Sequence, residues 1–183
     1  TGNLNALIAA TGDASVTAAG NLTVGGSAIN LATSSAGTTS FGATTLTGAL
    51  TANSVGDITQ TGAITTGAPS TITSSTGDIT LNNAGNSFFG ATSLSGQDVT
   101  VAAAGNLEAL IAATGNASVS AAGNLIVGGS AINLATSSGG TTSFGATTLT
   151  GGLNTTSVGD ITQTGAITTG APSSITTSMG GIT

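Results

Sequence analysis

The chain has 183 residues, of which six are acidic and none is lysine, arginine or histidine, so its formal net charge is −6. Neutralising a nucleic-acid backbone or an anionic membrane surface requires basic side chains, which excludes both as partners. The absence of cysteine excludes a disulfide framework and thiolate chemistry. The longest apolar run, residues 6–10, is far too short to span a membrane. Aliphatic residues nevertheless recur at regular places, which predicts a folded chain instead of a flexible linker.

The sequence repeats itself over a long period. When residues 1–80 are aligned with residues 104–183, 66 of the 80 positions are identical without a gap. The period is therefore 103 residues, with a first copy at 1–103 and an incomplete second copy at 104–183. Self-similarity at a fixed period is typical of repeat architectures. We therefore expect residues 1–183 to be a single segment of a longer repetitive protein.

Short segments of alternating aliphatic and hydroxyl residues occur along each copy. In chain order, clear examples lie at residues 20–24, 56–59, 77–81 and 97–101, and each begins with glycine or glutamine followed by asparagine or aspartate. Alternation with a period of two predicts short strands with one apolar face. Glycine, serine, asparagine and proline between the segments are typical turn residues.

The spacing of these segments predicts the fold class. The last three segments start at positions 56, 77 and 97, and five steps of this size account for the long repeat period. We therefore expect an all-β chain wound into a parallel β-helix, with about 20 residues per coil, about nine coils in all and five coils in each long repeat. Equivalent residues would then stack about 4.8 Å apart, where rows of like charges would repel one another.

Residues 4–10 and 107–113 fit this scheme less well, because they contain good helix formers at helical spacing. Each stretch is bounded by glycine and is too short for an independent helix, so we favour a wide strand over a helical insertion. Phe41 and Phe144 occupy equivalent positions in the two copies, and we expect both to pack in the core or at a turn.

The segment motifs resemble those of a known family. GNLTV at 20–24, GDIT at 56–59 and GDITL at 77–81, with AAGNL and VGGSAINL beside the first of them, resemble the repeats of filamentous-haemagglutinin-type bacterial adhesins. The resemblance covers essentially the whole chain. It implies a right-handed parallel β-helix and export by a two-partner-secretion-like route. It also implies a structural shaft of an extracellular surface adhesin or fibre, which attaches cells to one another or to surfaces, as in biofilms.

The expected partners follow from this architecture. Neither residues 1–7 nor residues 178–183 resemble the polar caps that close repeat proteins. We therefore expect the ends to continue into further repeats of the same protein or to pair head to tail with copies of it. Surface glycans are a further partner that the resemblance to adhesins implies.

Catalysis has little support in the sequence. Glycoside hydrolysis needs two neighbouring carboxyl groups, which Asp57 and Asp78 would supply if their coils were adjacent. The alternative interpretation is that glycine followed by aspartate caps a turn through its own backbone. A serine nucleophile would lack a histidine base. We expect no enzyme activity, no catalytic residue and no cofactor.

Calcium is the one metal that the sequence suggests. Asp57, Asp78 and Asp98 would stack on successive coils, and carboxylates are calcium ligands. The alternative is that all three are solvated turn residues. In the second copy Asp160 keeps the place of Asp57, but Gly181 replaces Asp78. We therefore predict no metal site and keep the three aspartates as the only Ca²⁺ candidates.

The outward hydroxyls support an alternative function. Thr45-Leu46-Thr47 and Thr71-Ile72-Thr73 resemble the Thr-x-Thr arrays of ice-binding β-helices. Such a function requires one face to repeat this pattern on consecutive coils. The pattern here changes to Ser15-Val16-Thr17 and Ser93-Leu94-Ser95 and to single threonines at positions 59, 80 and 100. An ice- or glycan-binding β-helix that presents threonine and serine ladders is therefore the alternative to an adhesin shaft.

Overall fold

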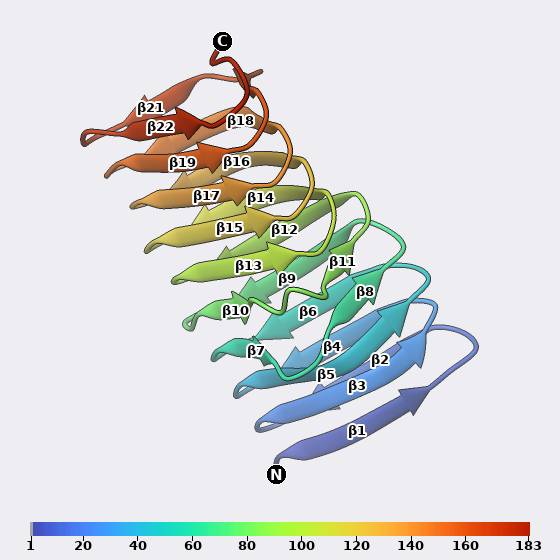
Figure 1. Ribbon diagram of the computed structural model, residues 1–183. Helices are drawn as coiled ribbons and strands as arrows, with labels where there is room; N and C mark the ends of the chain where they lie inside the picture. The colour runs from blue at the N-terminus through green and yellow to red at the C-terminus, as the bar shows by residue number, and fades with distance from the viewer. Residues whose placement is uncertain (1) are drawn as a thin grey trace.

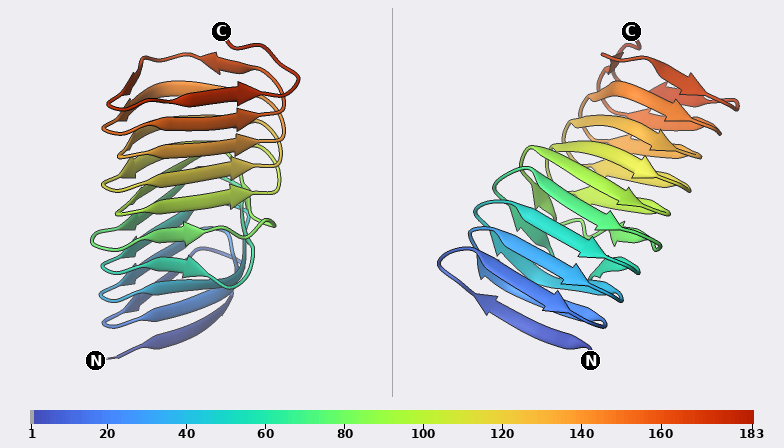
Figure 2. Two further views of the ribbon diagram at one scale, coloured as in Figure 1. Left: turned by 60° about the vertical axis from the view of Figure 1, so that its left-hand side comes forward. Right: turned by 180° about the vertical axis from the view of Figure 1, so that it is seen from behind.

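The computed structural model describes residues 2–183, which form one stack of about ten coils (Figure 1). Each coil contributes strands to two parallel sheets that face each other. The N-terminal and C-terminal coils lie at opposite ends of the stack (Figure 2). The predicted all-β parallel β-helix is therefore confirmed.

Sheet A contains twelve strands. They are β1 (Leu4–Ala9), β3 (Leu22–Ala28), β5 (Thr39–Leu46), β7 (Ile58–Gln60), β8 (Ile64–Thr66), β10 (Ile79–Leu81), β11 (Ser87–Phe88), β13 (Val99–Ala103), β15 (Ala117–Ala121), β17 (Leu134–Ser138), β19 (Leu153–Ser157) and β22 (Ser174–Thr177). Sheet B contains ten strands. They are β2 (Ala14–Ala18), β4 (Leu31–Ser35), β6 (Leu50–Ser54), β9 (Ser70–Ser74), β12 (Ala91–Gly96), β14 (Leu107–Ala113), β16 (Leu125–Ala131), β18 (Thr142–Leu149), β20 (Ile161–Gln163) and β21 (Ile167–Thr169).

Neighbouring coils pair in register, but the coils differ in length. The first coils are short, since Leu4 pairs with Leu22 and Leu22 pairs with Thr39. The steps are longest around the middle of the chain, where Ile72 pairs with Leu94. The coil length expected from the sequence was therefore slightly too long for most of the stack, which is why the chain makes about ten coils and not nine.

The two copies of the long repeat lie half a coil out of phase. Strand β1 belongs to sheet A, whereas β14, the same strand one period later, belongs to sheet B. From Leu4 the register in sheet A passes through five further coils to Val99, and Leu107 follows half a coil later in the other sheet. One long repeat is therefore five and a half coils. The expectation of five coils was wrong. It was based on segments that all precede strands of sheet A, so it missed the extra half-coil that ends in sheet B.

The stretches with helical spacing are strands. Residues 4–10 contribute β1 and residues 107–113 form β14, in which buried and exposed residues alternate along the whole strand. The preference for a wide strand over a helix is confirmed. In β14 the paired backbones of β12 and β16 on either side satisfy the peptide groups and override the helix propensity of the residues.

The core is a column of aliphatic side chains between the two sheets. Its largest fully buried members are Phe41, Phe144, Leu22, Leu31, Leu50, Ile58, Ile64, Ile72, Ile79, Leu81, Leu94 and Leu125. The expected burial of Phe41 and Phe144 is confirmed, since neither ring has any exposed surface. The buried residues form one continuous cluster from Val16 to Ile161, so the core extends through most of the stack.

A glycine-dependent bulge interrupts the ladder at equivalent places in the two copies. Gly26 in sheet A and Gly129 in sheet B both have φ of +117°, a conformation that L side chains rarely adopt. A Cβ atom at either position would lie 1.9 Å from a backbone carbonyl oxygen, that of Ile8 or Ile111. Glycine is therefore required at both positions.

Buried polar groups occupy fixed positions beside the core. At one corner the Ser35 hydroxyl lies 2.8 Å from that of Thr39 and 2.9 Å from that of Ser54. Ser138, Thr142 and Ser157 form the same triad, with the same two distances, in the second copy. These hydroxyls satisfy one another, which allows their burial.

One coil is irregular. Between β10 and β12 the chain makes a short excursion that contains the fully buried Asn86. The Asn86 amide exchanges two hydrogen bonds of 2.8 Å with the amide of Gln60 and accepts another from the backbone of Ile64. This amide pair fixes the excursion against the coil before it.

Across residues 2–183 there is no helix with the length and apolarity needed to cross a membrane.

Candidate functional site

Two ladders of asparagine and aspartate run along the turns, immediately before the strands of each sheet. At most of these asparagines and aspartates the side-chain Oδ1 accepts a hydrogen bond from the backbone N–H of the equivalent residue one coil later. Asn3 accepts from Asn21 at 3.0 Å, and Asn21 accepts from Thr38 at 3.0 Å. In the other sheet Asn106 accepts from Asn124 at 2.9 Å. These Asx ladders hold neighbouring turns together at the outer edge of the stack.

Asp57, Asp78 and Asp98 occupy three successive positions of one Asx ladder. The Oδ1 of Asp57 accepts from the Asp78 backbone at 2.9 Å, and that of Asp78 accepts from the Asp98 backbone at 3.0 Å. The expected stacking of the three residues is therefore present. The Oδ1 atoms of Asp57 and Asp78 cap the backbone of the next coil and not that of their own turn, which differs from the sequence interpretation. Within residues 2–183 no three acidic side chains are grouped so that they could hold a metal ion.

The same geometry bears on the proposed carboxyl pair. Asp57 and Asp78 lie on adjacent coils, as glycoside hydrolysis would require, but each has one oxygen committed to the backbone of the next coil. The sequence supplies no histidine, lysine, arginine or cysteine to accompany them. The two carboxylates therefore link the turns of successive coils.

The outer face of sheet B presents two columns of small polar residues over β2, β4, β6, β9 and β12. We call this surface the sheet-B hydroxyl face. The first column is Ser15, Ala32, Thr51, Thr71 and Ser93, and the second is Thr17, Ser34, Asn53, Thr73 and Ser95. Three of the Thr-x-Thr-like segments of the sequence, those centred on residues 16, 72 and 94, are thereby brought together.

A matching surface lies on the outside of sheet A over β13, β15, β17, β19 and β22. We call it the sheet-A hydroxyl face. Its columns are Thr100, Ser118, Ala135, Asn154 and Ser174, and Ala102, Ser120, Ser137, Thr156 and Thr176. The half-coil offset between the copies therefore places equivalent hydroxyls on opposite sides of the stack.

Thr45 and Thr47 do not join these columns. Thr45 lies in β5 of sheet A and pairs with Ser27 and Thr65, whereas Thr47 follows the end of the strand. The single threonines 59, 80 and 100 do lie on successive coils of sheet A, in a column that leads into the sheet-A hydroxyl face.

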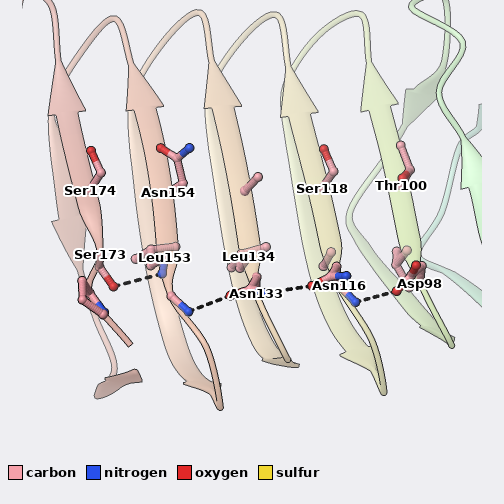
Figure 3. A pocket seen from close by; sticks show the side chains of 15 residues that line it. Asp98, Thr100, Asn116, Ser118, Asn133, Leu134, Leu153, Asn154, Ser173 and Ser174 are labelled. Atoms are coloured by element: carbon pink, nitrogen blue, oxygen red, sulfur yellow. Dashed lines mark hydrogen bonds between the residues drawn. The ribbon is translucent and has the colours of Figure 1, made fainter. Parts of the chain in front are cut away.

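A groove of about 670 Å³ runs across five coils beside the sheet-A hydroxyl face. Figure 3 shows its edge, where Asp98, Asn116 and Asn133 continue the Asx ladder and the Ser173 hydroxyl accepts a hydrogen bond from the backbone N–H of Leu153 in the preceding coil. Asn116 donates its backbone N–H to Asp98 at 2.6 Å, and the Asn133 side chain donates to that of Asn116 at 2.9 Å. Thr100, Ser118, Asn154 and Ser174 project from the strands above this edge. The groove is therefore long, uncharged except at Asp98, and lined by hydroxyls and amides together with apolar residues such as Leu134, Leu153 and Pro172.

Sequence reasoning missed one group of surface residues. Phe89 exposes 67% of its surface and lies in a depression with Glu108 and Ile126, which come from two later strands. The sequence signal was available in part, because Glu108 and Ile126 are positions at which the second copy departs from the first. Only the strand register shows that they lie beside Phe89.

Comparison with protein-family models matches residues 28–95 and 129–183 to a family described as repeats of unknown function (DUF5649). The two matches begin almost one repeat period apart and together cover more than half of the chain. Searches of curated proteins and of solved structures found no match.

Proposed function

Since the chain belongs to this family of repeats of unknown function, we propose its role from its architecture: it is a structural shaft of an extracellular bacterial surface adhesin or fibre. Its task is to hold an attachment site at a distance from the cell. The filamentous-haemagglutinin-like motifs support this proposal, as does a sequence without any site for proteases that cut after lysine or arginine.

The observation that carries the proposal is the unbroken pairing of coils from β1 to β22. Every coil pairs with its neighbours through parallel strands in both sheets, and the Asx ladders add bonds at the turns. Ten coils at about 4.8 Å each give a rod about 45 Å long. Because each coil contacts only its neighbours, added repeats lengthen the rod without a change of its cross-section.

The length of the rod provides the test. A chain with one additional long repeat should be longer by five and a half coils, or about 26 Å, with an unchanged diameter. Small-angle scattering or electron microscopy of both chains measures the difference. A rise in diameter with no rise in length would contradict the shaft. Immunogold labelling of intact producing cells tests the location, and label found only after permeabilisation would contradict a surface fibre.

A second candidate function is recognition of ice or of glycans by the two hydroxyl faces. The observation that favours it is the continuity of paired columns over five successive coils, with about 4.8 Å between coils and about 7 Å between columns. An ice-affinity assay with purified protein tests ice binding. Exclusion of the chain from growing ice into the liquid, as for an inert protein of the same size, would remove that candidate.

A further inference from the structure

A compact apolar and acidic patch lies on the outside of sheet B. We call Phe89, Glu108, Leu110 and Ile126 the Phe89 patch. Leu110 and Ile126 expose 55% and 49% of their surface, and Phe89 exposes still more. Phe89, Glu108 and Ile126 line a depression of about 340 Å³ with Asn106 and Asn124. Exposed apolar side chains that gather around one depression, as Phe89 and Ile126 do, are typical of an interaction surface.

The strand register explains why these residues meet. Ala91 of β12 pairs with Glu108 of β14, and Glu108 pairs with Ile126 of β16. Phe89 is separated from Ala91 by Gly90, whose φ is +72°. A Cβ on Gly90 would lie 3.0 Å from the Pro69 ring. Phe89 is therefore held outside the core by a turn that favours glycine.

The charge of the patch is unlike that of the rest of the chain. Glu108 is the only glutamate, and its exposed carboxylate lies on the outer face of a strand, where it accepts no hydrogen bond within residues 2–183. Each of the five aspartates instead lies in an Asx ladder and accepts a backbone N–H with Oδ1. The chain contains no basic side chain that could pair with Glu108.

We propose that the Phe89 patch binds an arginine side chain of a partner protein. The exposed ring offers a face for a guanidinium group, and the adjacent carboxylate offers two acceptor oxygens for its forked N–H groups. Ile126 and Leu110 offer apolar surface for the methylene stem. Arginine fits better than lysine, because its planar group stacks on a ring and binds a carboxylate through two hydrogen bonds at once.

The first copy of the repeat lacks this chemistry. Asn5 and Thr23 stand where the second copy has Glu108 and Ile126, and they lie on sheet A at the opposite side of the stack. The double variant Glu108→Asn/Ile126→Thr therefore exchanges the patch for residues that the same strands already accommodate. It should fold normally and keep all five aspartates.

The test is an NMR titration of the whole chain with the blocked peptide Gly-Gly-Arg-Gly-Gly at low salt. The expected result is saturable shifts of the backbone amides of Phe89, Glu108 and Ile126. The same peptide with citrulline, a neutral isostere of arginine, should bind at least about fivefold more weakly. The double variant should lose the arginine preference while its spectrum elsewhere stays unchanged.

Three outcomes would overturn the proposal. The first is equal shifts with the arginine and citrulline peptides. The second is arginine-dependent shifts that lie at the aspartates of the Asx ladders and persist in the double variant, which would show only the attraction of net negative charge. The third is a response of the patch to cellotetraose and none to arginine, which would assign the patch to a neutral glycan.

Discussion

The two copies of the long repeat have nearly the same sequence but lie in opposite sheets. Phe41 is fully buried under sheet A, and Phe144, its copy, is fully buried under sheet B. The bulge glycines Gly26 and Gly129 keep the same φ of +117° on the two sides. The structural unit is therefore the half-coil, one strand and its turn, because either sheet provides the same inner environment.

The copies differ where a half-coil meets solvent or a particular neighbour. Asn5 and Thr23 become Glu108 and Ile126 on an outer face, which changes the surface without a change in the register. A buried difference also exists, since the fully buried Ala52 becomes Thr155. Substitutions at equivalent positions therefore test whether the two sheets contribute equally to stability.

The largest effect is expected at the bulge glycines. Gly129→Ala should lower the free energy of unfolding by about 3 kcal/mol or more, because its Cβ would overlap the carbonyl oxygen of Ile111 inside the stack. Gly26→Ala should cost less, since Ile8 lies in the edge strand β1, which can move away. Urea denaturation followed by circular dichroism measures both.

Gly145→Ala is the matched control for these variants. Its Cβ would approach no atom closer than 3.9 Å and its φ is not positive, so it should change stability by less than about 1 kcal/mol. A loss as large as that of Gly129→Ala would show that the bulge geometry is not the cause.

The next effect concerns a buried hydroxyl that has a partner in one copy only. Thr136 donates to Thr155 at 3.1 Å, whereas Thr33, its equivalent, faces Ala52 and finds no hydrogen-bond partner among residues 2–183. Thr155→Ala should cost about 1–3 kcal/mol and Ala52→Thr should gain about 1 kcal/mol. Thermal unfolding of both variants checks the signs. A loss of stability with Ala52→Thr would contradict the equivalence of the two sites.

A smaller effect is expected in the Asx ladders. Asn21→Ala and Asn124→Ala each remove one acceptor for the backbone of the next coil, from Thr38 or Thr141. Each should cost about 1 kcal/mol, and hydrogen exchange should become faster at the two released amides. If exchange at Thr38 and Thr141 stayed as slow as in the unchanged chain, the ladders would not be holding the turns.

The smallest effect is expected from charge. Asp78→Asn keeps the acceptor oxygen but removes the middle of three stacked carboxylates, so it should stabilise the chain by a few tenths of a kcal/mol at low salt and by less at high salt. Melting curves at low and at high salt measure this stabilisation, and curves with and without calcium chloride test for calcium binding. Stabilisation of the unchanged chain by calcium, lost in the variant, would instead support the calcium hypothesis for Asp57, Asp78 and Asp98.

Much of the fold could be predicted from alternation alone. The pattern of apolar and hydroxyl residues predicted the strands, and the nearly equal steps between Asp57, Asp78 and Asp98 predicted their stacking. The half-coil offset could not be predicted in the same way. The strands of sheet B that lie between these aspartates begin after Pro69 and Gly90, without the aspartate that precedes β7, β10 and β13.

The candidate sites depended on the register more than on composition. Phe89 and Glu108 lie on neighbouring coils and meet only because this coil has a particular length, which the irregular excursion around Asn86 helps to set. Asn86 itself gave no signal, since one buried asparagine cannot be told from the many asparagines of turns. The Thr-x-Thr segments were visible, but their faces could be assigned only from paired strands.

The most direct test of the half-coil stack is a spin-label distance between Ser93→Cys and Ser118→Cys. With five coils per repeat these residues would be neighbours in one column, about 4.8 Å apart. The structure places them on the outer faces of opposite sheets, so pulsed electron paramagnetic resonance should give more than about 20 Å. The control pair Thr73→Cys/Ser95→Cys lies on adjacent coils, and its spectrum should show strong dipolar broadening. The same broadening for Ser93→Cys/Ser118→Cys would contradict the half-coil stack.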